Sequence, residues 1–301
     1  MKRIFKIGGL IVGILVVLLG VVLVVGSNLA DRKIKRTVTV DVKPVAYASG
    51  PEVLARGQYL FMTRGCMDCH DENGKGRAFI NDPNGFYVKA PGITVAPGSR
   101  TASYQEVDWV RTIRHGVNPQ GRPLFIMPSE DYNRLTDNDL AAVVAYVRSL
   151  PPQANEALET RLPLPVKVLY GFGAIPDAFE KIDHTLPPST PVPADTSAQH
   201  GAYVANMCIG CHGQGLSGGK IPGAPPDWPA AANLTPGENS VMPRYDGVDA
   251  FKAMMRSGKR PNGSAVNTVM PFDSLKNLND TELTALHAYL KTLPAKAAGN
   301  R

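Results

Sequence analysis

The chain has 301 residues, of which 44% are hydrophobic and 19% are charged. This length suffices for two domains of ordinary size, and the composition excludes a globally disordered chain. The formal net charge is +6, but lysine and arginine form no long run with interleaved aromatic residues, so no nucleic-acid binding is expected.

The chain opens on a short basic segment and an uncharged apolar run from Ile7 to Gly26. About 20 apolar residues are needed to span a bilayer as a helix, whereas the apolar region of a cleavable signal peptide has only about 7–15. We therefore predict a transmembrane anchor over residues 1–30. The alternative is a signal peptide, because Val24-Val25-Gly26 resembles a cleavage site.

A predicted tether covers residues 31–50. Four basic residues lie at its start, so the positive-inside rule favours neither orientation of the anchor. The alternation from Thr37 to Val42 is typical of a short strand or of extended chain.

The pattern C-x-x-C-H occurs twice, at Cys66–His70 and at Cys208–His212. It is the signature of covalent haem attachment, in which two thiols add to the haem vinyl groups and the histidine binds the iron. A zinc or thioredoxin-like site is the alternative for a single copy. Two copies, each followed at nearly equal distance by Met-Pro, favour haem. The motifs use every cysteine in the chain and predict these attachment residues and proximal ligands: Cys66, Cys69, His70, Cys208, Cys211 and His212.

Helices are expected around the first motif. Residues 52–63 lead into it, and residues 104–115 form the next candidate. A last helix begins near Thr136, which resembles a capping box with Asp139 and precedes an apolar stripe at i, i+3, i+4 and i+7. Pro151 ends this helix.

The second half of the chain repeats the first. Cys208 follows Cys66 by 142 residues, and Met270 follows Met127 by 143. Further residues in and around the two predicted terminal helices match one another at an offset of 143. An ordered set of matches at near-constant offset indicates a duplicated domain. A buried porphyrin would supply much of the core of each short unit.

These matches predict haem domains at residues 51–152 and 197–301, joined by a proline-rich connection over residues 153–196. Because the middle of the connection is apolar, we expect it to pack on other parts of the protein.

Met127 and Met270 are the predicted distal iron ligands, since each lies before a proline and just ahead of the terminal helix. Ligation by methionine and histidine raises the haem reduction potential. The alternative is that they only fill space, as most methionines do. Met242, Met254 and Met255 are the competing ligands in the second unit, but they have no counterpart in the first.

Several other polar residues receive secondary interpretations. Arg114 and Arg256 occupy matched positions and either bind a haem propionate or form solvated surface charge. Tyr59 and Tyr203 are interpreted as ordinary helix-packing residues. The remaining histidines are not expected to bind iron; His115 is placed in a loop or near a propionate, His184 and His200 at the surface, and His287 on a helix face.

These features together resemble class I cytochrome c domains in tandem. In that family the first and last helices cross at a glycine against an aromatic residue, and the distal ligand is a methionine in the late loop. The crossing residues here would be Gly57, Phe61, Tyr146, Gly201 and Tyr289, with Ala205 where Phe61 would align. The layout is similar to membrane-anchored dihaem cytochrome c subunits that serve periplasmic dehydrogenases.

The expected fold is therefore mostly α-helical, with a transmembrane helix followed by two haem domains. We expect two covalent haem c groups in an electron-transfer protein that is not itself an enzyme. Because covalent haem is attached outside the bacterial cytoplasmic membrane, the haem domains of this single-pass protein are expected in the periplasm. A dehydrogenase would be the electron donor, and a soluble cytochrome, the quinone pool or an oxidase would be the acceptor.

Three alternatives stay open at this point. A dihaem peroxidase would need one iron with an open coordination site. A thiosulfate-oxidising dihaem cytochrome would need a cysteine ligand, and the chain has no fifth cysteine. The dihaem subunit of a cbb-type oxidase is also anchored, but the spacing between the two motifs is long for that group.

Overall fold

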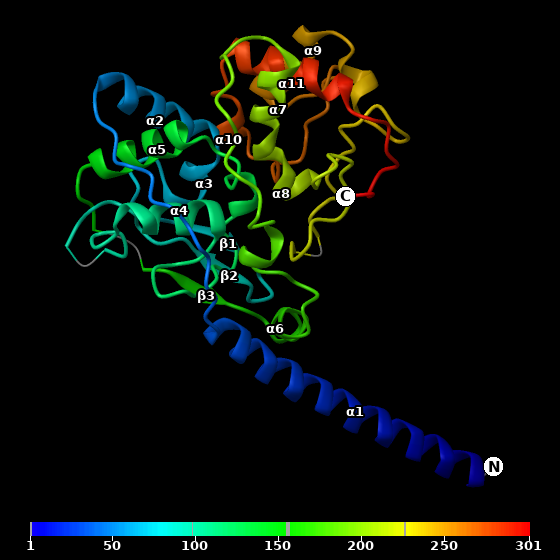
Figure 1. The fold of residues 1–301 in the computed structure, drawn as a ribbon. Helices are drawn as coiled ribbons and strands as arrows, with labels where there is room; N and C mark the ends of the chain where they lie inside the picture. Colours follow the sequence, from blue (N-terminus) through cyan, green and yellow to red (C-terminus); the bar gives the residue numbers. More distant parts are fainter. Residues whose placement is uncertain (1, 98, 155–156, 226) are drawn as a thin grey trace.

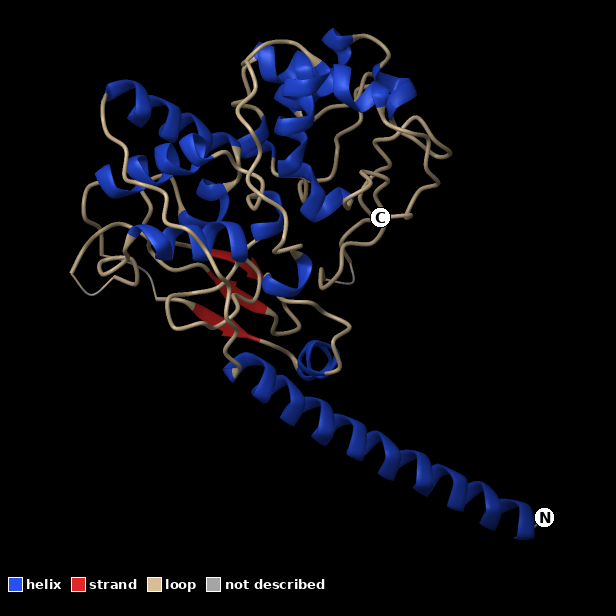
Figure 2. Ribbon diagram, in the orientation of Figure 1, coloured by secondary structure: helices blue, strands red, loops and turns tan. Residues whose placement is uncertain are grey.

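The computed structural model describes residues 2–97, 99–154, 157–225 and 227–301 and is mostly helical. A long N-terminal helix projects from two helical domains that pack side by side (Figures 1 and 2). The expected fold class is therefore confirmed.

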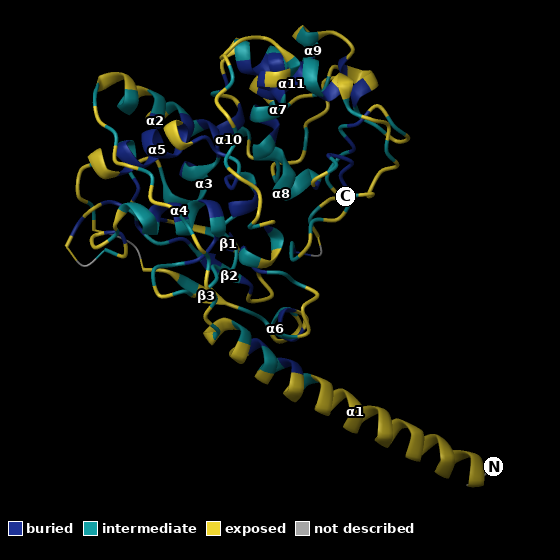
Figure 3. Cartoon of the chain, in the orientation of Figure 1, coloured by how far each residue is buried: buried dark blue, intermediate teal, exposed yellow. Residues whose placement is uncertain are grey.

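Helix α1 (Lys2–Lys35) contains the apolar run and continues five residues beyond the predicted anchor. Its 34 residues give a length of about 50 Å, enough to cross a bilayer. It is the one helix in the described part of the chain that is long and apolar enough to span a membrane. Figure 3 shows most of its surface exposed.

Among the residues that the structure describes, the first domain contains four α-helices and one short 3-10 helix. They are α2 (Pro51–Thr63), α3 (Cys66–His70), α4 (Glu106–His115), η1 (Ser129–Asp131) and α5 (Asp137–Ser149). The predicted helices start and end within about two residues of these bounds. Thr136 caps α5 by accepting a hydrogen bond from the Asp139 amide at 3.1 Å.

In the described part of the chain, the second domain has the same order of α-helices, with α10 (Phe272–Leu275) in the place of η1 and with two additional 3-10 helices. Its elements are α7 (Ala198–Ala205), η3 (Asn206–Cys208), α8 (Ile209–His212), η4 (Met242–Tyr245), α9 (Val248–Ser257), α10 and α11 (Asp280–Thr292). Asn279 caps α11 in the way that Thr136 caps α5, with its side chain accepting from the Glu282 amide at 2.8 Å.

Each domain is organised by a close crossing of its first and last helices. A Cβ atom added at Gly57 would lie 2.0 Å from a backbone oxygen of α5, and one added at Gly201 would lie 1.9 Å from a backbone oxygen of α11. Both positions therefore require glycine. In the first domain Phe61 packs against Tyr146 with 5.5 Å between ring centroids.

A small antiparallel sheet joins the connection to the first domain. Strand β2 (Tyr87–Lys89) pairs with β1 (Ala78–Asn81) on one side and with β3 (Glu159–Arg161) on the other. The connection then forms α6 (Leu164–Gly171) and the short η2 (Phe179–Lys181). The connection therefore packs on the first domain through β3 and through Tyr170, whose ring centroid lies 5.2 Å from that of Phe125, and α6 packs on α1.

The segment between α1 and α2 has no regular secondary structure, so the strand considered for residues 37–42 is absent. It lies along the first domain. The Val38 amide donates to the Gly121 carbonyl at 2.8 Å, and the Arg148 guanidinium lies 3.7 Å from the centroid of the Tyr47 ring. The end of α1 is thus tied to the first domain.

Candidate haem-binding sites

The first domain encloses a cavity of about 500 Å³. Its lining includes all four residues predicted for the first haem, with Cys66, Cys69 and His70 coming from α3 and Met127 from the loop before η1. Most of the remaining lining is apolar. A cavity of this volume and character is typical of a cofactor site.

In each motif histidine, one ring nitrogen is hydrogen-bonded to a backbone carbonyl. The Nδ1 atom of His70 lies 2.9 Å from the Pro91 carbonyl oxygen, and that of His212 lies 2.8 Å from the Ala232 carbonyl oxygen. Such a bond fixes the ring orientation and leaves Nε2 for a metal. Burial lowers the pKa of both histidines, which favours the neutral imidazole that binds iron.

The two predicted distal ligands lie in loops with the same local structure. The Ser129 amide donates to the Met127 carbonyl at 2.8 Å, and the Phe272 amide donates to the Met270 carbonyl at the same distance. The prolines that follow the methionines both have a φ of −79°. The methionines thus occupy equivalent backbone positions, and their binding to iron stays a prediction.

The competing methionines lie in the core of the second domain. Met242, Met254 and Met255 are buried in one cluster, against which the partly buried Met270 and Cys208 pack. Proximity to the attachment motif therefore does not separate these candidates, and the choice of Met270 rests on its match to Met127.

Trp109 provides a test of whether the first cavity suits a haem. Its indole lines the cavity, and its Nε1 atom is buried without a hydrogen-bond partner among the described residues. A buried indole N–H ordinarily has an acceptor, and a haem propionate oxygen would supply one. Arg100 and Arg122 add positive charge to the lining. The cavity therefore fits an apolar macrocycle with acidic substituents.

The alternatives to haem attachment find less support. Among the residues that the structure describes, no group of three or more His, Cys, Asp or Glu side chains is placed to hold a metal ion, as a zinc site would require. Burial raises the pKa of Cys66, Cys69 and Cys208 to about 12 and that of Cys211 to about 11. Thioredoxin-like chemistry depends instead on a thiolate.

Arg114 is not solvated surface charge, which was one of its two predicted roles, and its binding to a propionate stays a prediction. Its guanidinium is buried and donates to the Leu135 carbonyl at 2.7 Å and to Asp137 Oδ1 at 2.8 Å, so it joins α4 to the start of α5. Arg256 makes the matching ion pair with Asp280. Trp109, Arg100 and Arg122 were not singled out from the sequence, because nothing in their local pattern marks them as cavity residues.

The histidines outside the motifs also differ in part from expectation. His200 is buried in α7 rather than exposed, and His184 stacks on Phe179 and lies 2.9 Å from His115, measured between their Nδ1 atoms. His287 is on α11 as predicted, but it is buried, with its Nε2 atom 2.7 Å from the Tyr245 carbonyl oxygen.

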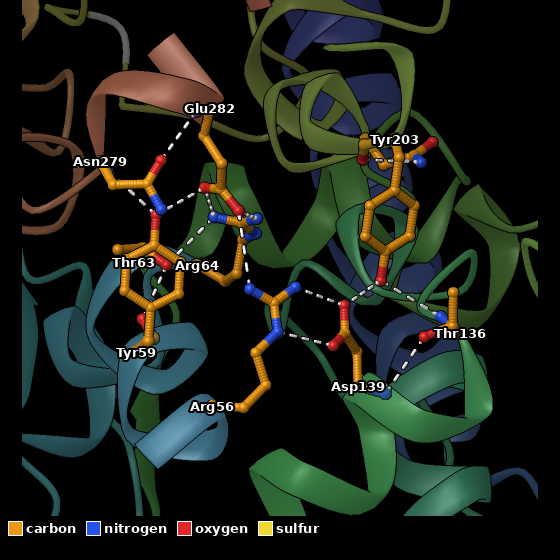
Figure 4. A network of polar contacts seen from close by, with 10 residues as sticks. Arg56, Tyr59, Thr63, Arg64, Thr136, Asp139, Tyr203, Asn279 and Glu282 are labelled. Carbon is orange, nitrogen blue, oxygen red and sulfur yellow. Dashed lines mark hydrogen bonds and ion pairs between the residues drawn. The ribbon is translucent and has the colours of Figure 1, made fainter. Parts of the chain in front are cut away.

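Tyr59 and Tyr203 pack against apolar clusters, as predicted, but the hydroxyl of each also binds the other domain, which the interpretation as ordinary packing residues did not include (Figure 4). The Tyr59 hydroxyl, on α2, donates to Glu282 Oε2 at 2.8 Å and accepts from the Asn279 amide at 3.1 Å. The Tyr203 hydroxyl, on α7, donates to Asp139 Oδ2 at 2.6 Å. Each tyrosine thus binds the first turn of the other domain's terminal helix, which indicates a pseudo-twofold arrangement.

Two arginines strengthen this contact. Arg64 makes two hydrogen bonds to Glu282, at 2.8 and 3.0 Å, and both side chains are buried (Figure 4). Arg56 binds Asp139 of its own domain through two bonds of 2.8 Å and reaches across the interface to Glu282 Oε1, which lies 3.8 Å from its Nη1 atom. Burial alone would raise the pKa of each carboxyl, but the arginines outweigh it and lower the pKa of both Glu282 and Asp139.

The two attachment motifs also lie at this interface. The Ser274 hydroxyl donates to Asp68 Oδ2 at 2.8 Å, and the Gly210 amide donates to Asp131 Oδ1 at 2.7 Å. Asp68 and Gly210 are the residues before the second cysteine of each motif, whereas Asp131 and Ser274 lie four residues after the predicted methionine ligands. Each motif therefore contacts the methionine-bearing segment of the other domain.

Curated relatives resemble most of the chain. The fructose dehydrogenase cytochrome subunit of Gluconobacter japonicus is 26% identical over 92% of this chain and 58% of its own length. The gluconate 2-dehydrogenase cytochrome c subunit of Pantoea cypripedii is 26% identical over 82% and 60%, respectively. The cytochrome c subunit of alcohol dehydrogenase (quinone) from Gluconobacter oxydans is 24% identical over 82% and 56%. The chain thus spans less than two thirds of the length of each of these relatives.

A family model matches the chain twice. The model is that of cytochrome c, and it covers residues 54–151 and 198–294. Each match includes one C-x-x-C-H motif and the helix crossing around it, and it implies covalently bound haem c. Because the two matches cover more than half of the sequence, the chain belongs to the cytochrome c family.

Proposed function

We propose that this protein is a membrane-anchored dihaem electron-transfer subunit that relays electrons from a periplasmic dehydrogenase to a respiratory acceptor. The observation that carries this proposal is the reciprocal contact between the two attachment motifs and the methionine-bearing segments, through Asp68–Ser274 and Asp131–Gly210. Relatives that are cytochrome c subunits of fructose, gluconate and alcohol dehydrogenases support the choice of donor class.

We propose the same roles for the haem-binding residues of the two domains. In the first domain Cys66 and Cys69 would hold the haem covalently, and His70 and Met127 would supply the two protein ligands of the iron. Cys208, Cys211, His212 and Met270 would do the same in the second domain. A bound haem supplies one-electron redox chemistry. With a histidine and a methionine of the protein as ligands to each iron, neither site would admit a substrate, which suits a carrier rather than an enzyme.

The interface sets the relation between the two sites. Arg64 and Glu282 form a buried ion pair across the interface. Tyr59 and Tyr203 each bind the terminal helix of the other domain. These contacts hold each attachment motif against the methionine-bearing segment of the other domain, so that electrons could pass between the two sites within one chain. The acceptor would be a soluble cytochrome, the quinone pool or an oxidase.

We propose the following division of the chain into an anchor, two haem domains and the segments that join them. Residues 1–30 anchor the protein in the bacterial cytoplasmic membrane, and residues 31–50 lead to the first haem domain at 51–152. The connection at 153–196 carries the chain to the second haem domain at 197–301. Both haem domains lie in the periplasm, where covalent haem is attached.

Purification of the native complex from membranes tests this function. A dehydrogenase should copurify with the chain, and its substrate should reduce the haem of the complex, as followed by the visible absorption bands. The isolated chain should bind carbon monoxide poorly and should not turn over peroxide. Rapid carbon monoxide binding together with peroxide turnover would instead identify a haem enzyme.

A further inference from the structure

The end of α1 is packed directly against α6 of the connection. A Cβ atom added at Gly171 would lie 2.1 Å from the Gly26 carbonyl oxygen, and one added at Gly26 would lie 2.7 Å from Val168 Cγ1. The two helices therefore cross at glycine on both sides. Gly26 is also the last residue of the apolar run, so α6 meets α1 where the run ends.

Ion pairs between the end of α1 and the connection reinforce the contact between α1 and α6. Beyond Gly26, the last turns of α1 and the residue that follows the helix carry charges that pair with the connection: Lys33 with Glu180 at 2.6 Å, Arg36 with Asp177 at 2.8 Å, and Asp31 with Lys167 at 2.8 Å. Lys33 also lies 4.3 Å from the centroid of the Tyr170 ring. The position of α6 relative to α1 is thus fixed by packing and by charge.

The outer face of α6 and of the turn after it is apolar. Every exposed residue between positions 164 and 174 is apolar or glycine: Leu164, Pro165, Leu169, Phe172, Gly173 and Ala174. The three large side chains among them are 47%, 48% and 51% exposed, respectively. The one charged residue in this segment, Lys167, is paired with Asp31. Exposed apolar patches of this kind mark interaction surfaces.

We propose that α6 is a second membrane contact, whose Leu164, Leu169 and Phe172 side chains insert into the periplasmic leaflet of the bilayer that α1 spans. This inference rests on the anchoring under the proposed function. The apolar run of α1 is about 30 Å long, which matches the hydrocarbon thickness of a bilayer and places Gly26 at its boundary. A helix with one apolar face binds at this depth, in the interfacial plane.

Continuity with α1 identifies lipid as the occupant of this face. Val22 and Val25, within one helical turn of Gly26, are also exposed. A bilayer that covers them therefore reaches the α6 face without a break. Figure 3 shows this arrangement, with α6 beside the end of α1.

The second contact would orient the haem domains. A protein held by a single spanning helix can rotate about the axis of that helix. A second membrane contact beside the helix would prevent this rotation. The first domain and its sheet lie beside α6 at the end of α1, and the second domain lies farther away (Figure 1). The first haem site would therefore face the membrane, and the second would face the periplasm.

Crosslinking to lipid in vesicles tests the inference on the full holoprotein. The protein is reconstituted in phosphatidylcholine vesicles that contain a lipid with a photoactivatable diazirine on its acyl chain, and adducts are located by mass spectrometry of peptides. We expect adducts in residues 7–26 and in residues 164–174, and none in α9. The variant carrying Leu169→Glu and Phe172→Glu should lose the adducts at 164–174, keep those at 7–26 and retain its haem absorption spectrum.

Adducts at 7–26 without adducts at 164–174 in the native protein would overturn the inference and leave the anchor intact. The absence of adducts at both places would overturn the anchor as well. Protection of residues 164–174 from lipid, together with crosslinks from that segment to a copurified subunit, would show a protein partner and would also overturn the inference.

Discussion

Replacement of Glu282 by glutamine should weaken the contact between the two haem domains. The Glu282 side chain is 2% exposed and that of its partner Arg64 is 5% exposed. Glutamine keeps the shape and removes the negative charge, so the buried guanidinium of Arg64 loses its ion-pair partner. Removal of one member of a buried ion pair costs about 3–5 kcal/mol. For a chain of this size each kcal/mol lowers the unfolding midpoint by about 2–4 °C, which gives a decrease of about 6–20 °C.

Thermal unfolding of the holoprotein, followed by circular dichroism, measures this effect. Asp273→Asn is the matched control, because Asp273 pairs with Lys276 at 2.9 Å in an exposed ion pair of the same domain. Such surface pairs contribute about 0–1 kcal/mol. If Glu282→Gln lowered the midpoint no more than Asp273→Asn does, the buried pair would not stabilise the contact as argued.

Three further predictions concern packing, pH and iron ligation. Gly201→Ala should strongly destabilise the second domain in a thermal melt, because its Cβ would lie 1.9 Å from a backbone oxygen of α11, whereas Gly247→Ala should have little effect, since a Cβ there meets nothing within 4 Å. The arginine partners lower the pKa of Asp139 and Glu282 from 3.8 and 4.5, so the stability that these carboxylates contribute is present above those values and is lost as the pH falls through the lower folded values. The melting temperature should therefore fall when the pH is lowered below about 4. A melting temperature that stays constant in this pH range would show that the two ion-paired carboxylates do not contribute this stability. Met270→Ala should lower the potential of one haem in a redox titration and leave the other nearly unchanged; an unchanged titration would exclude Met270 as a ligand.

Local sequence patterns predicted the parts of the fold that depend on near neighbours. Thr136 caps the helix that it was expected to cap, because a hydroxyl at that position needs only the amide three residues on. The crossings at Gly57 and Gly201 join distant helices and were instead implied by the resemblance to class I cytochromes c; both glycines lie at such crossings. The repeat predicted that Met127 and Met270 occupy equivalent backbone positions, although it does not test their ligation.

Contacts between distant segments were not predictable in the same way. Residues 159–161 are too short and too irregular to indicate a strand, and they become one only by pairing with β2. Arg64 and Glu282 carry no local mark of a buried ion pair. One regularity did point to the interface: Tyr203 follows Tyr59 by 144 residues, the same offset that separates the two crossing glycines. Equivalent tyrosines in a duplicated domain suit a reciprocal contact.

The intact mass of the denatured protein tests the central claim most directly. We predict the mass of the polypeptide plus two haems for the native protein. The variant carrying Cys208→Ala and Cys211→Ala should have the mass of the polypeptide plus one haem. A native protein with the mass of the polypeptide alone, or one that releases all of its haem into acidified acetone, would contradict covalent attachment at both motifs.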